Sequence, residues 1–123
     1  MFEINKEYTR DYIQNSCGGS KDAFLPTLNG KVVAACLRAD LNPHAPEVII
    51  CSDAPAARAA GKTLARQAEA IPVFIKLETE LFRYVGQYAV SESLTAPVDC
   101  APYAQKSGLA VTQVSRVIKM NRC

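Results

Sequence analysis

The side chains that could carry covalent chemistry are few and scattered along this chain. The 123 residues include one histidine, His44, and five cysteines, at positions 17, 36, 51, 100 and 123. There is no GxSxG nucleophile motif and no CxxC or HxxxC spacing of the kind that zinc sites use. We therefore expect no catalytic residue, no metal site and no cofactor. A pairing of a cysteine with His44 as its base is the least favoured alternative, because only the fold could bring the two together.

The cysteines themselves favour a structural role. Their odd number argues against a complete disulfide framework. Cys36 lies within VVAACL and Cys51 within VIICS, and a free cysteine in apolar surroundings behaves as a small hydrophobic residue. His44, between Pro43 and Ala45, is equally well explained as an ordinary turn residue.

The most regular charge pattern is the row Arg58, Lys62 and Arg66, four residues apart each time. On a helix this row extends over about 12 Å, enough to follow about two or three phosphates of a nucleic acid. The alternative is a solvated helix face, which Glu69 would partly neutralise. The GKT triplet within this segment lies inside the expected helix, whereas a phosphate-binding loop needs its glycines before the helix.

Aromatic residues give a second indication of nucleic-acid binding. Phe82, Tyr84 and Tyr88 alternate within LFRYVGQYAV and would share one strand face, while Phe24 and Tyr103 lie in flanking loops. Bases can stack on such rings. The alternative is that the strand face belongs to the core.

Periodicity and turn signals predict the elements that would position these side chains. The first helix is expected near Lys6–Gln14 with Asn5 as its N-cap, and a Gly-Gly pair ends it. The main helix is expected to have Pro55 in its first turn and to be capped by Ser52 or Asp53. A loop of about 18 residues, with at most a turn of helix, is expected to precede the last strand. The expected strands are residues 31–38, 47–52, 71–77, 81–90 and 111–120.

These elements predict one α+β domain, residues 1–123, with a mixed, curled, five-stranded sheet. One main helix and one or two short helices would accompany it. The short ETE segment predicts an antiparallel hairpin, and Gly86 in mid-strand predicts a bulge or sharp bend. A small doubly wound sheet is the rival, but the strands cluster late and the helices are too few.

The segment AIPVFIKLETELFRYVGQYAV resembles a strand pair that recurs in PUA-like domains, a superfamily that includes EVE, ASCH and SRA-type modified-base readers. The resemblance extends over about Gly18–Val90. It implies a small curled sheet, a PUA-like barrel, that binds nucleic acid, often with a base in a pocket. The pocket would then be formed by the loops GGSKDAFLP and DLNPHAP.

We therefore expect a non-catalytic nucleic-acid-binding module that reads a base or modified base. Phe24, Asn42 and His44 would contact the base, and the phosphates would meet Lys21, Arg58, Lys62 and Arg66. The alternative is a small protein-binding accessory or inhibitor, such as one encoded by a mobile element. No apolar run is long enough to span a bilayer and the N-terminal segment is charged throughout, so we expect a cytoplasmic protein.

Overall fold

A curled sheet of mixed direction forms the centre of the domain. The structure, a computed structural model, describes residues 2–76 and 79–123. The principal strands follow the order β4-β6-β7-β8-β5, and β1 (Glu7–Tyr8) pairs with β7. β4 and β6 are parallel and the other pairs are antiparallel. The bounds of the five strands are Ala35–Arg38 (β4), Val48–Ser52 (β5), Ile71–Lys76 (β6), Phe82–Leu94 (β7) and Val114–Arg122 (β8).

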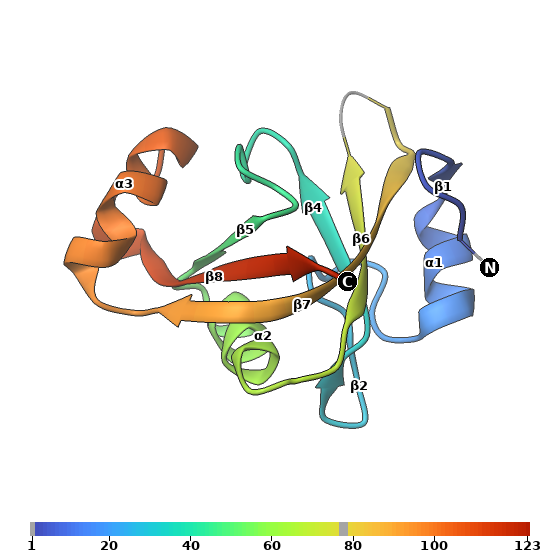
Figure 1. Cartoon of the computed structure of the whole chain (residues 1–123), viewed down its shortest axis with the longest axis horizontal. Coiled ribbons are helices and arrows are strands. Elements are labelled where there is room, and N and C mark those ends of the chain that lie inside the picture. Colours follow the sequence, from blue (N-terminus) through green and yellow to red (C-terminus); the bar gives the residue numbers. More distant parts are fainter. Residues whose placement is uncertain (1, 77–78) are drawn as a thin grey trace.

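The two edges of this sheet are consecutive in the chain but are not paired. Among the described residues no ladder joins β4 to β5, so the sheet is curled and open rather than a closed barrel. β4 and β5 diverge from the turn that connects them (Figure 1). This opening between the sheet edges is the architectural feature that matters for the site.

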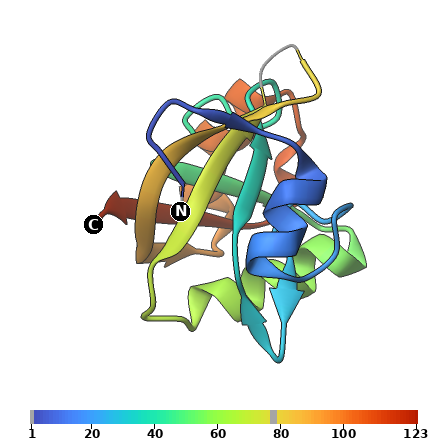
Figure 2. The same ribbon diagram turned by 90° about the vertical axis from the view of Figure 1, so that its right-hand side faces the viewer.

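Three helices surround the sheet at different places. Their bounds are Arg10–Cys17 (α1), Pro55–Ala65 (α2) and Pro97–Ser107 (α3). α1 and α3 lie at opposite ends of the molecule, and α2 lies between them along one side of the sheet (Figures 1 and 2). A separate small hairpin joins β2 (Thr27–Leu28) to β3 (Lys31–Val32). The α+β class and the mixed sheet expected from the sequence are confirmed.

The two faces of the sheet contribute to different hydrophobic clusters. On the inner side, Leu64 of α2 packs with Leu37, Ile49, Val73 and Ile118. The other face forms two clusters, one with α1 and one with α3. The α1 cluster contains Ile13, Cys36, Phe74, Phe82 and Tyr84, and the α3 cluster contains Val48, Ile50, Cys100 and Val117. Burial on both faces explains why β4, β5 and β6 read as nearly continuous apolar runs.

The predicted bulge at Gly86 is present, and it changes which face of β7 the following side chains occupy. The register between β6 and β7 shifts there: Phe74 faces Tyr84, but its neighbour Val73 faces Gly86. Gly86 has φ = 129°, a conformation that side-chain-bearing residues rarely adopt. The shift moves Tyr88 into the inner core while Tyr84 packs in the α1 cluster, so the prediction of one shared aromatic face is wrong.

Several element boundaries differ from the prediction. Thr9, not Asn5, caps α1, its hydroxyl accepting from Tyr12 N at 3.1 Å, because residues 7–8 pair with β7 instead of entering the helix. The expected strand 31–38 is divided into β3 and β4. The expected long loop is mostly structured: β7 continues to Leu94 and α3 follows.

Other details of the prediction also change. α2 begins after Ala54, which makes no side-chain cap hydrogen bond, so neither Ser52 nor Asp53 occupies the N-cap. Leu77 at the end of the expected third strand, and Glu78 in the turn after it, lie outside the described residues. In the described part of the chain, no helix is long and apolar enough to cross a membrane.

Candidate functional site

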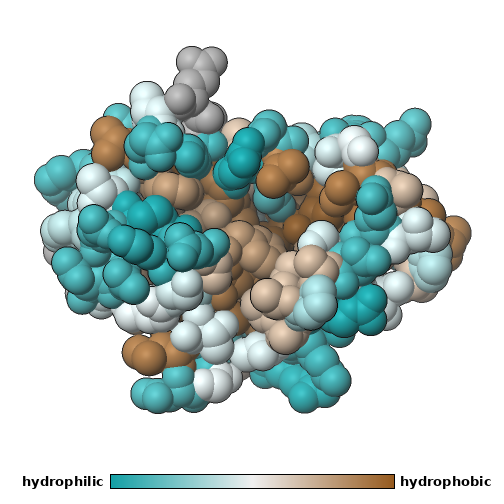
Figure 3. Space-filling model, turned by 180° about the vertical axis from the view of Figure 1, so that it is seen from behind, coloured by the Kyte–Doolittle hydropathy of each residue, from teal (hydrophilic) through white to brown (hydrophobic). Residues whose placement is uncertain are grey.

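A large cavity lies over the gap between β4 and β5. Its volume is about 830 Å³, and its wall includes residues from α1, both flanking loops, β4, β5 and β6. Figure 3 looks onto the side of the molecule opposite to that of Figure 1, where hydrophobic side chains gather in a hollow framed by hydrophilic ones. A cavity of this size is typical of sites that bind small molecules or single units of a polymer.

The loop after α1 supplies the first wall of the cavity. Residues 24–26 run along the outer edge of β4, where Phe24 O accepts from Cys36 N at 2.7 Å and Pro26 O accepts from Val33 N at 2.8 Å. This pairing fixes the backbone at Phe24, whose half-buried ring lines the cavity together with Lys21 and Asp22. The sequence prediction placed Phe24 and Lys21 at a binding site, and the structure places both on this wall.

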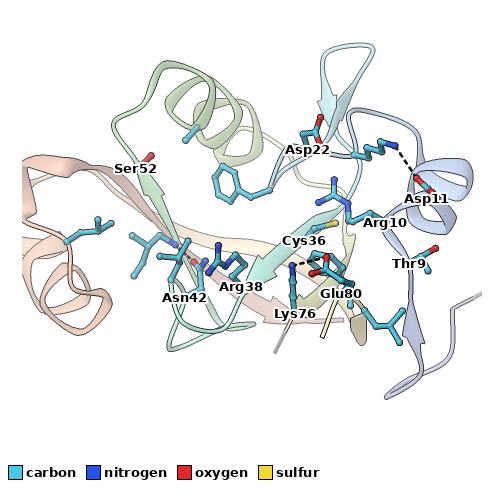
Figure 4. A pocket seen from close by; sticks show the side chains of 18 residues that line it. Thr9, Arg10, Asp11, Asp22, Cys36, Arg38, Asn42, Ser52, Lys76 and Glu80 are labelled. Atoms are coloured by element: carbon cyan, nitrogen blue, oxygen red, sulfur yellow. Dashed lines mark hydrogen bonds and ion pairs between the residues drawn. The ribbon is translucent and has the colours of Figure 1, made fainter. Parts of the chain in front are cut away.

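Arg10 at the start of α1 is held against the same loop. Its Nη2 donates to Ser20 O at 2.9 Å and to Ala23 O at 3.0 Å. Its Nε is buried and has no hydrogen-bond partner among the described residues. Arg10 therefore orders the loop and also brings a positive charge to the cavity wall (Figure 4).

The floor of the cavity combines apolar and basic side chains. Phe82 is buried, and both Arg10 Cζ and Lys76 Nζ lie close to its ring, at 5.5 Å and 5.9 Å from the centroid. Cys36 also lines the floor; burial raises the pKa of its thiol to about 12, and the nearby charge of Arg10 only partly opposes this. The Cys36 thiol is therefore neutral near pH 7, which makes it a poor nucleophile.

The loop between β4 and β5 supplies the opposite wall. Asn42 is buried and its Oδ1 accepts from Ile50 N at 2.9 Å, which satisfies a backbone donor on the exposed edge of β5. Asn42 thus holds the loop, and it lines the cavity together with Leu41 and Arg38. Arg38 forms a two-point ion pair with Asp40, with N–O distances of 3.2 Å and 2.8 Å.

His44 is the predicted base contact that the structure does not bring to the cavity wall. Its ring packs edge-on against Tyr103 of α3 with centroids 6.1 Å apart, and its carbonyl accepts from Val48 N at 3.1 Å. Phe24 therefore lines the cavity, whereas His44 packs against α3. No described group of three or more His, Cys, Asp or Glu side chains could hold a metal ion.

The basic row on α2 lies away from the cavity. Arg58 and Lys62 on the helix and Arg66 at its C-cap are all exposed. Lys62 and Arg66 line a second, smaller hollow of about 520 Å³ beside the β2–β3 hairpin, and Arg58 lines neither hollow. Glu69 is part of this second hollow, where it pairs with Lys31.

Sequence reasoning missed the cations that the fold gathers at the cavity. Arg10, Arg38 and Lys76 stand far apart in the chain, on α1, β4 and β6. One signal was available: Arg38 and Lys76 end two apolar strands, and these strands are parallel neighbours with Arg38 beside Lys76. The parallel pairing that places them together could not be predicted from the spacing.

Comparison with known proteins gives a family but no activity. No curated protein and no solved structure matches the chain. The model of a family described as a domain of unknown function, DUF6697, matches residues 7–107. The matched range includes α1, both loops and every strand that lines the cavity. The chain therefore belongs to the DUF6697 family.

Proposed function

We propose that this domain binds nucleic acid without catalysis and accepts one nucleotide unit in the cavity between β4 and β5. The observation that carries the proposal is the composition of that cavity. One hollow of about 830 Å³ joins an aromatic ring, an apolar floor and four basic side chains. The basic side chains are Arg10, Lys21, Arg38 and Lys76.

In this proposal Phe24 provides the stacking surface for a base. Its backbone is fixed along the edge of β4, and its ring is half-buried, so little conformational entropy is lost when a base stacks on it. Asn42 has its oxygen engaged by Ile50 N, which leaves its amide nitrogen as the donor toward a base.

The basic side chains of the rim would contact phosphates. Three carboxylates, those of Asp11, Asp22 and Glu80, also line the cavity, and two of them pair with Lys21 and Lys76 at 3.4 Å and 3.5 Å. Both acidic partners are largely exposed, and such pairs contribute little to stability. A phosphate can therefore replace either carboxylate at low cost, with release of counterions from the nucleic acid.

Fluorescence anisotropy with labelled single- and double-stranded DNA and RNA, with and without modified bases, tests the proposal. We expect binding at about 50 mM salt that weakens steeply toward about 200 mM. Phe24→Leu keeps an apolar side chain but removes the ring, so it should weaken binding about tenfold, whereas Phe24→Tyr should retain it. Absence of binding to every probe at about 50 mM salt would refute the proposal.

A second candidate is the binding of a protein partner, favoured by the apolar character of the same hollow. Leu41 lines the cavity and 47% of its surface is exposed, an arrangement typical of a contact for an apolar side chain of a partner. Leu41→Asp would then abolish partner binding, while nucleic-acid probes would show no affinity for the unaltered domain.

A further inference from the structure

Two cations of the cavity are arranged around a single ring. Arg10 comes from α1 and Lys76 from β6, and both lie near Phe82, with Cζ and Nζ at 5.5 Å and 5.9 Å from its centroid. In Figure 4 both side chains reach toward the part of the cavity that Cys36 lines. Like charges brought together in a partly apolar hollow repel each other, so this arrangement favours an anion between them.

The hydrogen-bonding state of Arg10 indicates where such an anion would bind. The two carbonyl contacts of Nη2 fix the plane of the guanidinium group. Nε is buried without a partner among the described residues, and none of the described carboxylates forms an ion pair with Arg10. A buried donor without an acceptor costs about 1–3 kcal/mol, a cost that an anionic acceptor would remove.

Lys76 can join the same anion. Its partner within the protein is Glu80, at 3.5 Å, and the Glu80 side chain is 96% exposed while that of Lys76 is 27% exposed. The Glu80 carboxylate is therefore the more solvated member of the pair. Replacement of Glu80 by a ligand anion would leave Lys76 close to its present position.

We infer that Arg10 and Lys76 form a binding subsite for a phosphate group beside Phe82. This inference deepens the proposed function. It rests on that function for one point, namely that the complete ligand is a nucleic acid. A phosphate has several acceptor oxygens, so one group can receive Nε of Arg10 and Nζ of Lys76 together. The phosphate can be free in solution or part of a polynucleotide, and the experiment separates these sources.

The direct test follows the Nε–Hε resonance of Arg10 in proton–nitrogen correlation spectra of the full chain. Inorganic phosphate is titrated at constant ionic strength against sodium chloride. We expect a saturable shift of this resonance with phosphate and none with chloride. A resonance that responds neither to inorganic phosphate nor to an oligonucleotide would overturn the inference.

Matched variants separate the subsite from general electrostatic attraction. Lys76→Gln should weaken phosphate binding by about tenfold or more, and Lys76→Arg should restore most of it, because arginine is the more effective phosphate ligand. Lys62→Gln removes the same charge from α2 and should change the affinity less than twofold. Equal losses in Lys76→Gln and Lys62→Gln would overturn the inference.

An oligonucleotide without a terminal phosphate distinguishes this inference from the proposed function. If it binds and shifts Arg10 Nε–Hε, a backbone phosphate occupies the subsite and both stand. If phosphate alone produces the shift and no oligonucleotide binds, the subsite stands and the nucleic-acid function fails. If oligonucleotides bind without any shift at Arg10, the function stands and the subsite is refuted.

Discussion

The domain has two basic regions that differ in how the chain builds them. Along α2 and at its C-cap, three exposed cations stand four residues apart, and no aromatic side chain lines the hollow that Lys62 and Arg66 share. At the cavity, four cations come from four separate segments and surround an apolar floor with Phe24 and Phe82. Charge alone is common on protein surfaces, whereas charge fixed around a ring and a hollow is typical of a binding site.

The largest expected effect is on oligonucleotide affinity, and two triple variants that each lose three positive charges test which basic region binds. Lys21, Arg38 and Lys76 are replaced by Gln in one, and Arg58, Lys62 and Arg66 in the other. The cavity variant should lose about 1,000-fold in affinity for oligonucleotides, since each of the three charged contacts contributes about tenfold. The α2 variant should lose only a few-fold. Anisotropy at one fixed salt concentration measures both, and a larger loss in the α2 variant would reverse the comparison.

A second prediction concerns the packing of α2 against β5, where Gly61 lies close to Cys51. A Cβ added to Gly61 would lie 2.7 Å from Cys51 Sγ, so Gly61→Ala should destabilise the fold by about 2 kcal/mol. This cost exceeds the gain of about 1 kcal/mol that alanine brings to a helix. Cys51→Ala removes the clashing sulfur, so the double variant should be less destabilised than the sum of the two single variants. Urea denaturation measures the coupling; strict additivity would contradict it.

A third prediction sharpens the description of the cavity wall. Asn42→Ala removes the acceptor of Ile50 N and should lower the free energy of unfolding by about 1–2 kcal/mol. His44→Ala, in the same turn, removes only a half-buried ring and should cost less than half as much. Thermal denaturation of the two variants compares them directly. A larger effect at His44 would show that the ring, not the amide, holds the turn.

The smallest effect concerns the buried thiols beneath the two regions. Burial raises the pKa of Cys36, under the cavity, and of Cys51, under α2, from an ordinary value of 9.0 to about 12. The folded state therefore keeps protons that the unfolded chain releases, so their contribution to stability is complete below pH 9 and decreases from pH 9 to about 12. By pH 10 each thiol should account for a loss of about 1 kcal/mol.

The variant Cys36→Ala isolates the contribution of the Cys36 thiol to the pH dependence of stability. Its free energy of unfolding, measured in urea at pH 8 and pH 10, should fall by about 1 kcal/mol less than that of the unaltered domain. An identical fall in both proteins would show that the Cys36 thiol does not titrate as its burial requires.

The sequence predicts best those parts of the fold that are determined by residues close together in the chain. The β6–β7 hairpin, the bulge at Gly86 and the end of α1 at Gly18 followed from short-range patterns. α3 was predicted only as a loop with at most a turn of helix. Pro97 is well suited to the first turn of a helix, but Pro102 lies inside α3, where proline is disfavoured.

The candidate site was predictable only in part, for a related reason. The two loops were proposed as walls of one pocket, and the structure places Lys21, Phe24 and Asn42 in a single cavity. Arg10 and Lys76 were not predicted, because their proximity depends on pairings between distant segments. Evenly spaced charges on one helix are visible in a sequence, and charges that meet through the sheet are not.

The bulge at Gly86 also sets a limit on how this domain can change. β7 belongs to two cores only because its side chains exchange faces at that residue. Loss or gain of one residue between Tyr84 and Tyr88 would reverse the orientation of one half of the strand. Either Phe82 would leave the cavity floor or Tyr88 would leave the inner core. Substitutions at the exposed positions of β7 are therefore compatible with the architecture, whereas a change in its length at this point is not.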